Sequence, residues 1–353
     1  MRHVNIPVFV PHLGCPKQCV FCDQRAISGV RSFDEGEARR VIEAHLATLA
    51  GAEAEIAFFG GSFTGIGRKR MTALLDMAEE YVRAGLVRGI RFSTRPDFID
   101  PEIISVLCRY TVSAAELGIQ SSSDRVLALS KRGHTAQDSQ RAVRLLLDAG
   151  FPVVGQMMLG LPGSGAEDDR DTARFIADCG AAYARIYPTV VFRNTELHDM
   201  LTRGEYVPLT EEEAVERGAD VLAVFAERGV EVIRMGLPEG AGEEAFAAGP
   251  RHPAMGERIR SRLYGRIIDK ALTEAGIPLR GEGHRADVTV FSAPGEISAA
   301  AGYRGENKIR IENKFNVKKV KFIANPTVSR YNITLSSELS TVGEGIRHVF
   351  KKP

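Results

Sequence analysis

The 353-residue sequence lacks the features that would place the protein in a membrane or outside the cell. No apolar run approaches the roughly 20 residues that span a bilayer, and the first residues contain no apolar core of a signal peptide. Only five cysteines are present, and three lie within eight positions, which does not fit a secreted disulfide framework. There is no excess of charge either, since the formal net charge is +1. We therefore expect a cytoplasmic protein with no membrane partner.

The composition is that of an ordinary globular protein, with 44% hydrophobic and 26% charged residues. Over the first two hundred residues, strand-like and helix-like patterns alternate. The expected strands are 5–10, 54–60, 89–94, 112–120, 151–159 and 183–192. The expected helices are 33–50, 70–85, 100–110, 123–130, 135–149 and 166–180.

Six strands joined by helical crossovers indicate a parallel sheet, because parallel neighbours cannot be joined by a short hairpin. Eight units would make a complete barrel, so we expect α/β architecture with a partial (β/α)6 TIM-like barrel over residues 1–200. Beyond residue 200 the alternation fades. Residues 201–353 are expected to form a smaller C-terminal α+β portion of unknown role. Functional residues should lie where the strands end.

The first strand is followed by a loop with the spacing CxxxCxxC, formed by Cys15, Cys19 and Cys22. Three thiolates this close would repel one another unless a cation held them, so we expect a bound metal. Zinc is one candidate, with His12 or His3 as a fourth ligand. A 4Fe-4S cluster is the other: three irons take one cysteine each, and the fourth is left open for a small molecule.

This loop, with Phe21 before its last cysteine, resembles that of the radical S-adenosylmethionine (SAM) superfamily. The resemblance implies a 4Fe-4S cluster, bound SAM, a 5′-deoxyadenosyl radical and an external electron donor of the flavodoxin or ferredoxin type. Sequence motifs at later strand ends match the family's ligand contacts. They assign Gly60, Gly61 and Ser62 to the methionine amino group, Ser93 and Glu116 to the ligand, Gln120 and Gln156 to the ribose, Arg132 to the carboxylate, and Tyr187 to the adenine or substrate.

Within that superfamily, "GGSFT", "STRPD", "RGHT", "GLPG" and "IYPTVVFRNTEL" resemble the radical domain of the Elongator catalytic subunit family over about residues 5–200. That family modifies tRNA uridine, which makes a tRNA or another RNA the leading expectation for the substrate. The sequence shows no acetyltransferase-like region, so the complete Elongator reaction is not expected.

Two other interpretations stay open. An enzyme acting on a small metabolite or a porphyrinogen is one, because oxygen-independent coproporphyrinogen oxidase shares similar strand ends, although Phe9 stands where that family has a tyrosine. A zinc-stabilised RNA-binding module without catalysis is the other. Residues 305–353 contain ten Lys/Arg against four Asp/Glu, which is typical either of a solvated strand edge or of contact with phosphates.

Overall fold

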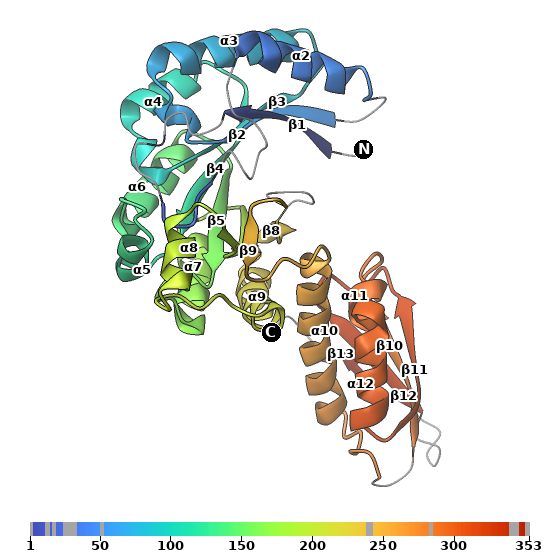
Figure 1. Cartoon of the computed structure of the whole chain (residues 1–353). Coiled ribbons are helices and arrows are strands. Elements are labelled where there is room, and N and C mark those ends of the chain that lie inside the picture. Colours follow the sequence, from blue (N-terminus) through green and yellow to red (C-terminus); the bar gives the residue numbers. More distant parts are fainter. Residues whose placement is uncertain are drawn as a thin grey trace. The chain divides into compact units, whose positions relative to one another are not determined.

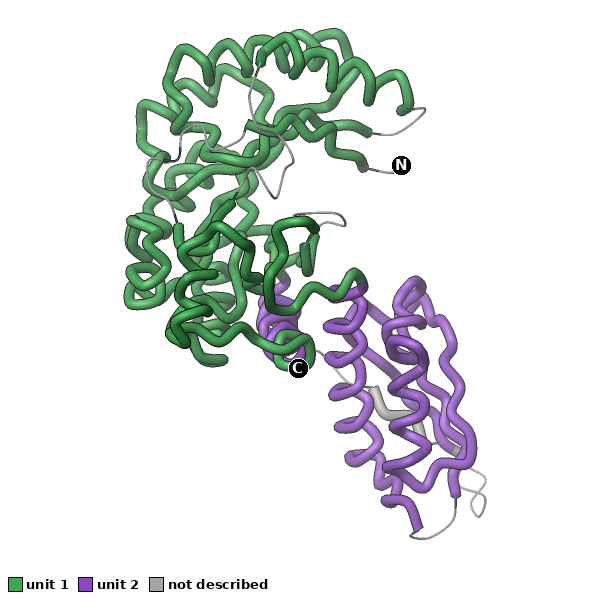
Figure 2. The backbone as a smooth tube through the Cα atoms, in the orientation of Figure 1, with its two compact units in different colours: residues 1–214, 230–253 green, residues 215–229, 254–353 purple. Residues whose placement is uncertain are grey.

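The computed structural model describes residues 3–10, 15, 19–23, 34–49, 53–237, 243–281, 285–338 and 346–349. The chain divides into two compact units, coloured separately in Figure 2: residues 1–214 with 230–253, and residues 215–229 with 254–353. These units are defined by their compactness and not by independent folding. The expected division into domains 1–200 and 201–353 therefore stays a prediction.

Unit 1 is built on a curved, wholly parallel sheet with helices on its outer side (Figure 1). Its seven strands, in spatial order, are β1 (His3–Val10), β2 (Glu53–Gly60), β3 (Gly89–Thr94), β4 (Val112–Gln120), β5 (Val153–Leu159), β6 (Tyr183–Pro188) and β8 (Glu231–Met235). The expected fold class is confirmed, and the sheet has one strand more than the six expected. The seventh strand, β8, is half-exposed at the edge of the sheet and short, which weakens its sequence pattern.

The crossovers are helical, as the sequence predicts. Unit 1 contains α2 (Glu35–Leu46), α3 (Arg68–Arg83), α4 (Pro101–Leu107), α5 (Asp124–Leu129), α6 (Ala136–Asp148), α7 (Ala166–Asp178) and α8 (Glu196–Thr202), with the 3-10 turns η1 (Phe63–Gly65) and η2 (Pro96–Phe98). Side chains cap several helix starts: Asp34 accepts from the Gly36 N–H, and Thr135 and Asp138 form a capping box. None of the described helices is both long and apolar enough to cross a bilayer.

The expected strand over residues 183–192 is divided in two. After β6 ends at Pro188, the chain continues as β7 (Val191–Phe192), which pairs antiparallel with β9 (Phe246–Ala248) in a separate small sheet. The pairing partner β9 lies more than fifty residues away, so no local pattern indicates the break.

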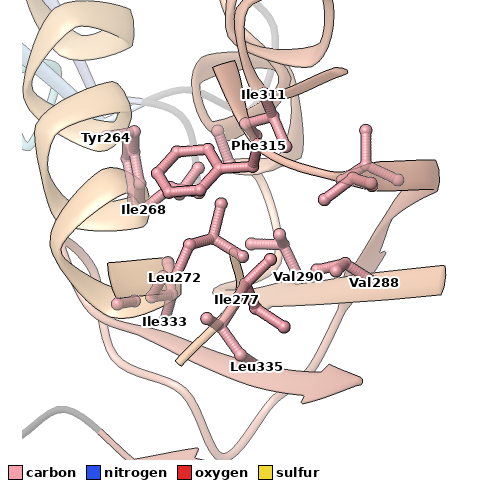
Figure 3. Close-up of a cluster of buried hydrophobic side chains, with 14 of the residues drawn as sticks. Tyr264, Ile268, Leu272, Ile277, Val288, Val290, Ile311, Phe315, Ile333 and Leu335 are labelled. Carbon is pink, nitrogen blue, oxygen red and sulfur yellow. The ribbon is translucent and has the colours of Figure 1, made fainter. Parts of the chain in front are cut away.

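Unit 2 has a mixed sheet of four strands. Its elements are the last part of α9 (Glu211–Glu227), then α10 (Met255–Glu274), β10 (Ala286–Ser292), α11 (Ile297–Ala301), η3 (Tyr303–Gly305), α12 (Glu306–Lys314), β11 (Val317–Ala324), β12 (Ile333–Glu338) and β13 (Ile346–Val349). The strand order is β11-β10-β12-β13, with only β10 and β11 parallel. Figure 3 shows Leu272 of α10 and Phe315 packing with Val290 of β10 in its core. The α+β character expected for the C-terminal portion is confirmed.

The close packing of α7 on β5 in unit 1 depends on a glycine. A Cβ at Gly155 would lie 2.4 Å from Cγ2 of Ile176, and both residues are buried. We predict that Gly155→Ala lowers the free energy of unfolding by about 1–3 kcal/mol, measured by urea denaturation. In an Ile176→Ala background the same change should cost much less, because the obstructing methyl is gone.

The control is Gly36→Ala in the first turn of α2, where a Cβ would make only ordinary contact with Asp34 at 3.6 Å. This variant should keep or slightly raise stability. An equal cost of Gly155→Ala in both backgrounds would show that the helix does not depend on this contact.

Candidate functional site

A cavity of about 1290 Å³ lies inside the curved sheet of unit 1. Residues from β1 to β6, from β8 and from the loops at their C-terminal ends line it. Of the thirteen site residues predicted from the sequence, twelve line this one cavity: Cys15, Cys19, Phe21, Cys22, Gly60, Gly61, Ser93, Glu116, Gln120, Arg132, Gln156 and Tyr187. The predicted residues therefore converge in space, and their individual roles stay predictions.

The exception is Ser62, which is not among the residues that line the cavity. It is 1% exposed, and its hydroxyl lies 2.7 Å from the hydroxyl of Thr94, a lining residue. Its backbone forms a hydrogen bond to Cys15. Ser62 thus contacts the cysteine loop through its main chain.

The cysteines occupy the end of the cavity near the C-terminal ends of the strands. Arg132 binds there by two hydrogen bonds, from Nη1 to the Cys19 sulfur at 3.2 Å and from Nη2 to the Gly118 carbonyl at 2.6 Å. Burial raises the pKa of the Cys15 thiol, while the Ser62 backbone and the charges of Arg95 and Arg132 act in the opposite direction. This cationic surrounding suits a bound thiolate.

No three His, Cys, Asp or Glu side chains in the described part of the chain lie in metal-binding geometry, so the cluster site stays a prediction. Of the two histidines considered as zinc ligands, His3 begins β1. His12 lies outside the described residues.

Two glycines lie where the end of β2 contacts the end of β1. The Gly61 N–H donates to the Val10 carbonyl at 2.8 Å, which holds the turn after β2 against the end of β1. Gly60 has a φ of +108°, and a Cβ there would lie 3.1 Å from the same carbonyl. A side chain would therefore be strained and crowded, which explains glycine at this turn.

Several buried polar atoms near the cysteines have no hydrogen-bond partner among the described residues. They are Gln120 Oε1, Arg132 Nε and Arg95 Nη1, on residues that are 4–6% exposed. Gln120 also has a φ of +67°, beside an irregularity in the pairing of β4 with β5. Unpartnered buried polar atoms are costly, so the cavity is suited to a ligand that supplies both donors and acceptors.

An ion-pair network crosses the inner wall of the sheet. Arg91 on β3 donates to Glu55 on β2 at 3.1 Å and to Glu116 on β4 at 3.1 Å. The same oxygen of Glu116 accepts from Arg185 on β6 at 2.9 Å, and Arg185 also donates to the Tyr187 hydroxyl at 3.2 Å. Burial alone would lower the pKa of Arg185, but the attraction to Tyr187 and Glu116 outweighs it and raises the pKa, so the guanidinium stays charged.

The sequence reasoning missed Arg91, Arg95 and Arg185. Two of them could have been found from the period of a strand, in which residues two apart point to the same face. Arg91 lies two positions before Ser93, and Arg185 two positions before Tyr187. Because Ser93 and Tyr187 are predicted to face the site, the same alternation predicts that these two arginines also point inward. Arg95 follows its strand, where alternation no longer applies.

Comparison with known proteins gives two family matches. The family model of the radical SAM superfamily matches residues 9–176, and that of the radical SAM C-terminal domain matches residues 181–265. The two matches together cover most of the chain and include every residue predicted for the cavity.

Among curated proteins, the chain is 39% identical over 126 residues to a tRNA uridine(34) acetyltransferase of Methanocaldococcus infernus, covering 35% of this chain and 24% of that protein. It is 33% identical over 141 residues to Elongator complex protein 3 of Mus musculus, covering 38% of this chain and 25% of that protein. An uncharacterized protein of Methanocaldococcus jannaschii is 28% identical over 231 residues, covering 62% of this chain and 70% of that protein. The chain thus spans about a quarter of the length of the two named relatives.

Among solved structures, archaeal Elp3 of Methanocaldococcus infernus with an N-terminal deletion superposes with a TM-score of 0.59 at 23% identity. The match covers 78% of this chain and 63% of that one, and it supports the fold. None of these comparisons favours the porphyrinogen or the zinc-module interpretation.

His134, the last residue of the sequence "RGH", makes the folding stability of the protein depend on pH. Burial and the neighbouring Arg132 lower the pKa of His134 from its ordinary value of 6.5 to about 4. The unfolded chain therefore binds more protons between these pH values, and the free energy of unfolding falls as the pH is lowered through this window.

We predict that lowering the pH from 7 to 5 removes about 2 kcal/mol from the free energy of unfolding through His134. Urea denaturation of the protein and of His134→Gln at both pH values measures this contribution. Equal pH slopes in the two proteins would contradict it.

Proposed function

Because the chain belongs to the radical S-adenosylmethionine superfamily, we propose that it holds a 4Fe-4S cluster at Cys15, Cys19 and Cys22 and binds SAM beside it. The observation that supports this most is the convergence of twelve of the thirteen predicted residues on one cavity. The donor set fits as well, since iron-sulfur clusters are bound by thiolates, and an N–H donor such as Arg132 near a ligating sulfur stabilises the negative charge of a cluster.

The chain's own residues would bind and orient the ligand. Arg132 has its Nε free of any described partner and can bind the methionine carboxylate, for which a guanidinium is well shaped. Gln120 and Gln156, on the neighbouring strands β4 and β5, line the cavity and offer amides to the ribose hydroxyls. Gly60 and Gly61 line the cavity and carry no side chain that would block the amino group.

When bound, the cluster and SAM would supply a 5′-deoxyadenosyl radical, a species that reacts with almost any C–H bond it meets. Selectivity must therefore come from the protein, which has to position one hydrogen and exclude competing groups. Phe21, Phe59 and Tyr187 line the cavity and can shield such a species from water. An external reductant of the flavodoxin or ferredoxin type would deliver the electron.

For the substrate we propose an RNA, with a tRNA uridine as the leading candidate. The support is the similarity to proteins named tRNA uridine(34) acetyltransferase and Elongator complex protein 3. Lys318, Lys319 and Lys321 of β11 are exposed and add positive charge that can contact a phosphate backbone. The cytoplasm stays the predicted compartment.

We predict that Cys22→Ala abolishes cluster binding, because two thiolates cannot hold the irons that three would hold. After anaerobic reconstitution the unmodified protein should contain roughly four irons per chain and absorb broadly near about 400 nm. It should form 5′-deoxyadenosine from SAM with dithionite, and Cys22→Ala should lose all three properties. Cys108→Ala is the matched control, since Cys108 is an exposed cysteine at the end of α4 and should keep them.

Persistence of 5′-deoxyadenosine formation in Cys22→Ala would show that the cysteine loop is not the reaction centre. A colourless unmodified protein containing one zinc and no iron would contradict the cluster itself.

The substrate is tested in cells by comparing the nucleosides of tRNA and the small metabolites of a strain lacking the gene with those of its parent. We expect a modified uridine to disappear from the tRNA, measured by mass spectrometry of digested RNA. A strain expressing only Cys22→Ala should show the same loss, and Cys108→Ala should restore the modification. Unchanged nucleosides with an altered metabolite would overturn the RNA proposal and leave the radical chemistry intact.

A further inference from the structure

Two arginines stand next to each other on the inner wall of the cavity. Arg185 of β6 and Arg234 of β8 are register partners in the parallel pairing of these strands, and both line the cavity. Neighbouring strands lie about 4.8 Å apart, and like charges opposite each other on a sheet repel. Such a pair is costly in a partly buried wall unless a negative charge lies between the two groups.

The ion-pair network is balanced before Arg234 is counted. Its cations are Arg88, Arg91 and Arg185, and its anions are Glu53, Glu55 and Glu116. Arg234 then adds a positive charge that has no ion-pair partner among the described residues. Within the part of the chain that the structure describes, no ion pair links Glu231, the acidic residue of β8, to either Arg185 or Arg234.

Arg185 is held in position and has a hydrogen-bond donor left for a further contact. Its guanidinium lies over the Phe59 ring, 5.7 Å from the centroid, while Glu116 and Tyr187 hold its two terminal nitrogens. Its Nε is buried and has no hydrogen-bond partner among the described residues. Among the described residues, Arg234 makes one long hydrogen bond, from its Nε to the Gly236 carbonyl at 3.4 Å. Donors are thus available on both side chains.

We propose that Arg185 and Arg234 form a binding subsite for an oxyanion, a carboxylate or a phosphate, on the substrate that enters this cavity. The anion would lie between the two guanidinium groups and offset the charge of Arg234, which has no ion-pair partner among the described residues. Charge-assisted hydrogen bonds from Arg to such groups are among the strongest polar contacts. That the bound oxyanion belongs to the substrate rests on the proposed function; the existence of the subsite does not.

Neither residue of the subsite is itself assigned to SAM, although Arg185 contacts Glu116 and Tyr187, which are assigned to the ligand or to the adenine. Arg185 lies two residues before Tyr187 on β6, and Glu116 lies four residues before Gln120 on β4, so the network sits on the N-terminal side of the ligand-binding strand ends. Arg132 donates to Cys19 and Gly118 and forms no hydrogen bond or ion pair with the described residues of the network. The chain would therefore bind two anionic groups at two positions along the same cavity.

The test is calorimetric titration of the full chain with inorganic phosphate, and separately with acetate, at constant ionic strength because salt screens such contacts. Arg185→Gln and Arg234→Gln should each weaken binding by about tenfold or more, as expected for loss of a hydrogen bond to a charged group. Arg144→Gln, an exposed arginine of α6, is the matched control and should change affinity by less than about twofold. Binding of acetate as well as phosphate would assign a carboxylate-compatible subsite, and binding of phosphate alone would assign a phosphate.

Arg132→Gln separates this subsite from the cysteine end of the cavity, and phosphate should still bind to that variant. If Arg132→Gln abolishes binding while Arg185→Gln and Arg234→Gln do not, the anion binds at the cysteine end and the proposal is overturned. Absence of phosphate and acetate binding to the unmodified chain would overturn it too. Arg234→Gln keeps the test valid if Arg185→Gln unfolds, because Arg234 has no described carboxylate partner to leave unpaired.

Titration of the chain before and after cluster reconstitution keeps this proposal apart from the proposed function. Phosphate binding does not need the cluster, so a failed reconstitution leaves the isotherm readable. Conversely, 5′-deoxyadenosine formation without bound substrate does not need Arg234, so normal formation in Arg234→Gln together with weakened phosphate binding would assign that arginine to the substrate alone.

Discussion

The pleat of a parallel strand places successive side chains on opposite faces, and this alternation determines how unit 1 is built. Crossover helices cover the outer face of the sheet. Ile56, Phe58 and Phe92 point toward these helices and are therefore fully buried. The residues between them then point inward, and several of them line the cavity. In a closed barrel they would have to fill the interior with apolar side chains. In this half-barrel they are free to be polar, which is why the inner wall can form a binding cavity.

A polar inner wall has its own requirement, because a buried charge is stable only when it is paired and hydrogen-bonded. The network meets this requirement by sharing carboxylates across strands. Glu116 alone joins β3, β4 and β6 through its contacts with Arg91 and Arg185. The residues that stabilise the wall are therefore the residues that give the cavity its charge, and removal of one affects both properties.

Local patterns in the sequence were sufficient for most of the sheet and for the residues that gather in one cavity beside the cysteines. Period-two segments joined by helical segments predicted six strands within a few residues, and the cysteine spacing together with "GGSFT" and "RGHT" predicted residues that the structure brings into one cavity. What the sequence did not predict depends on pairing between distant segments. The β7–β9 ladder, the edge strand β8 and the register that sets Arg185 beside Arg234 join residues about fifty positions apart, and no local period reports such a match.

The two ends of the cavity also differ in how far their residues can be substituted. Cys15, Cys19 and Cys22 lie on a loop, next to a glycine turn whose conformation few other residues can adopt, so this end has little freedom to change. Arg185 and Arg234 project from strands whose backbone hydrogen bonds do not depend on the side chain. A substitution at these two positions can alter which anionic group the cavity accepts while the sheet and the cysteine end keep their geometry. Under the function proposed above, radical generation would depend on the loops of this fold, and the choice of substrate on the inner faces of β6 and β8.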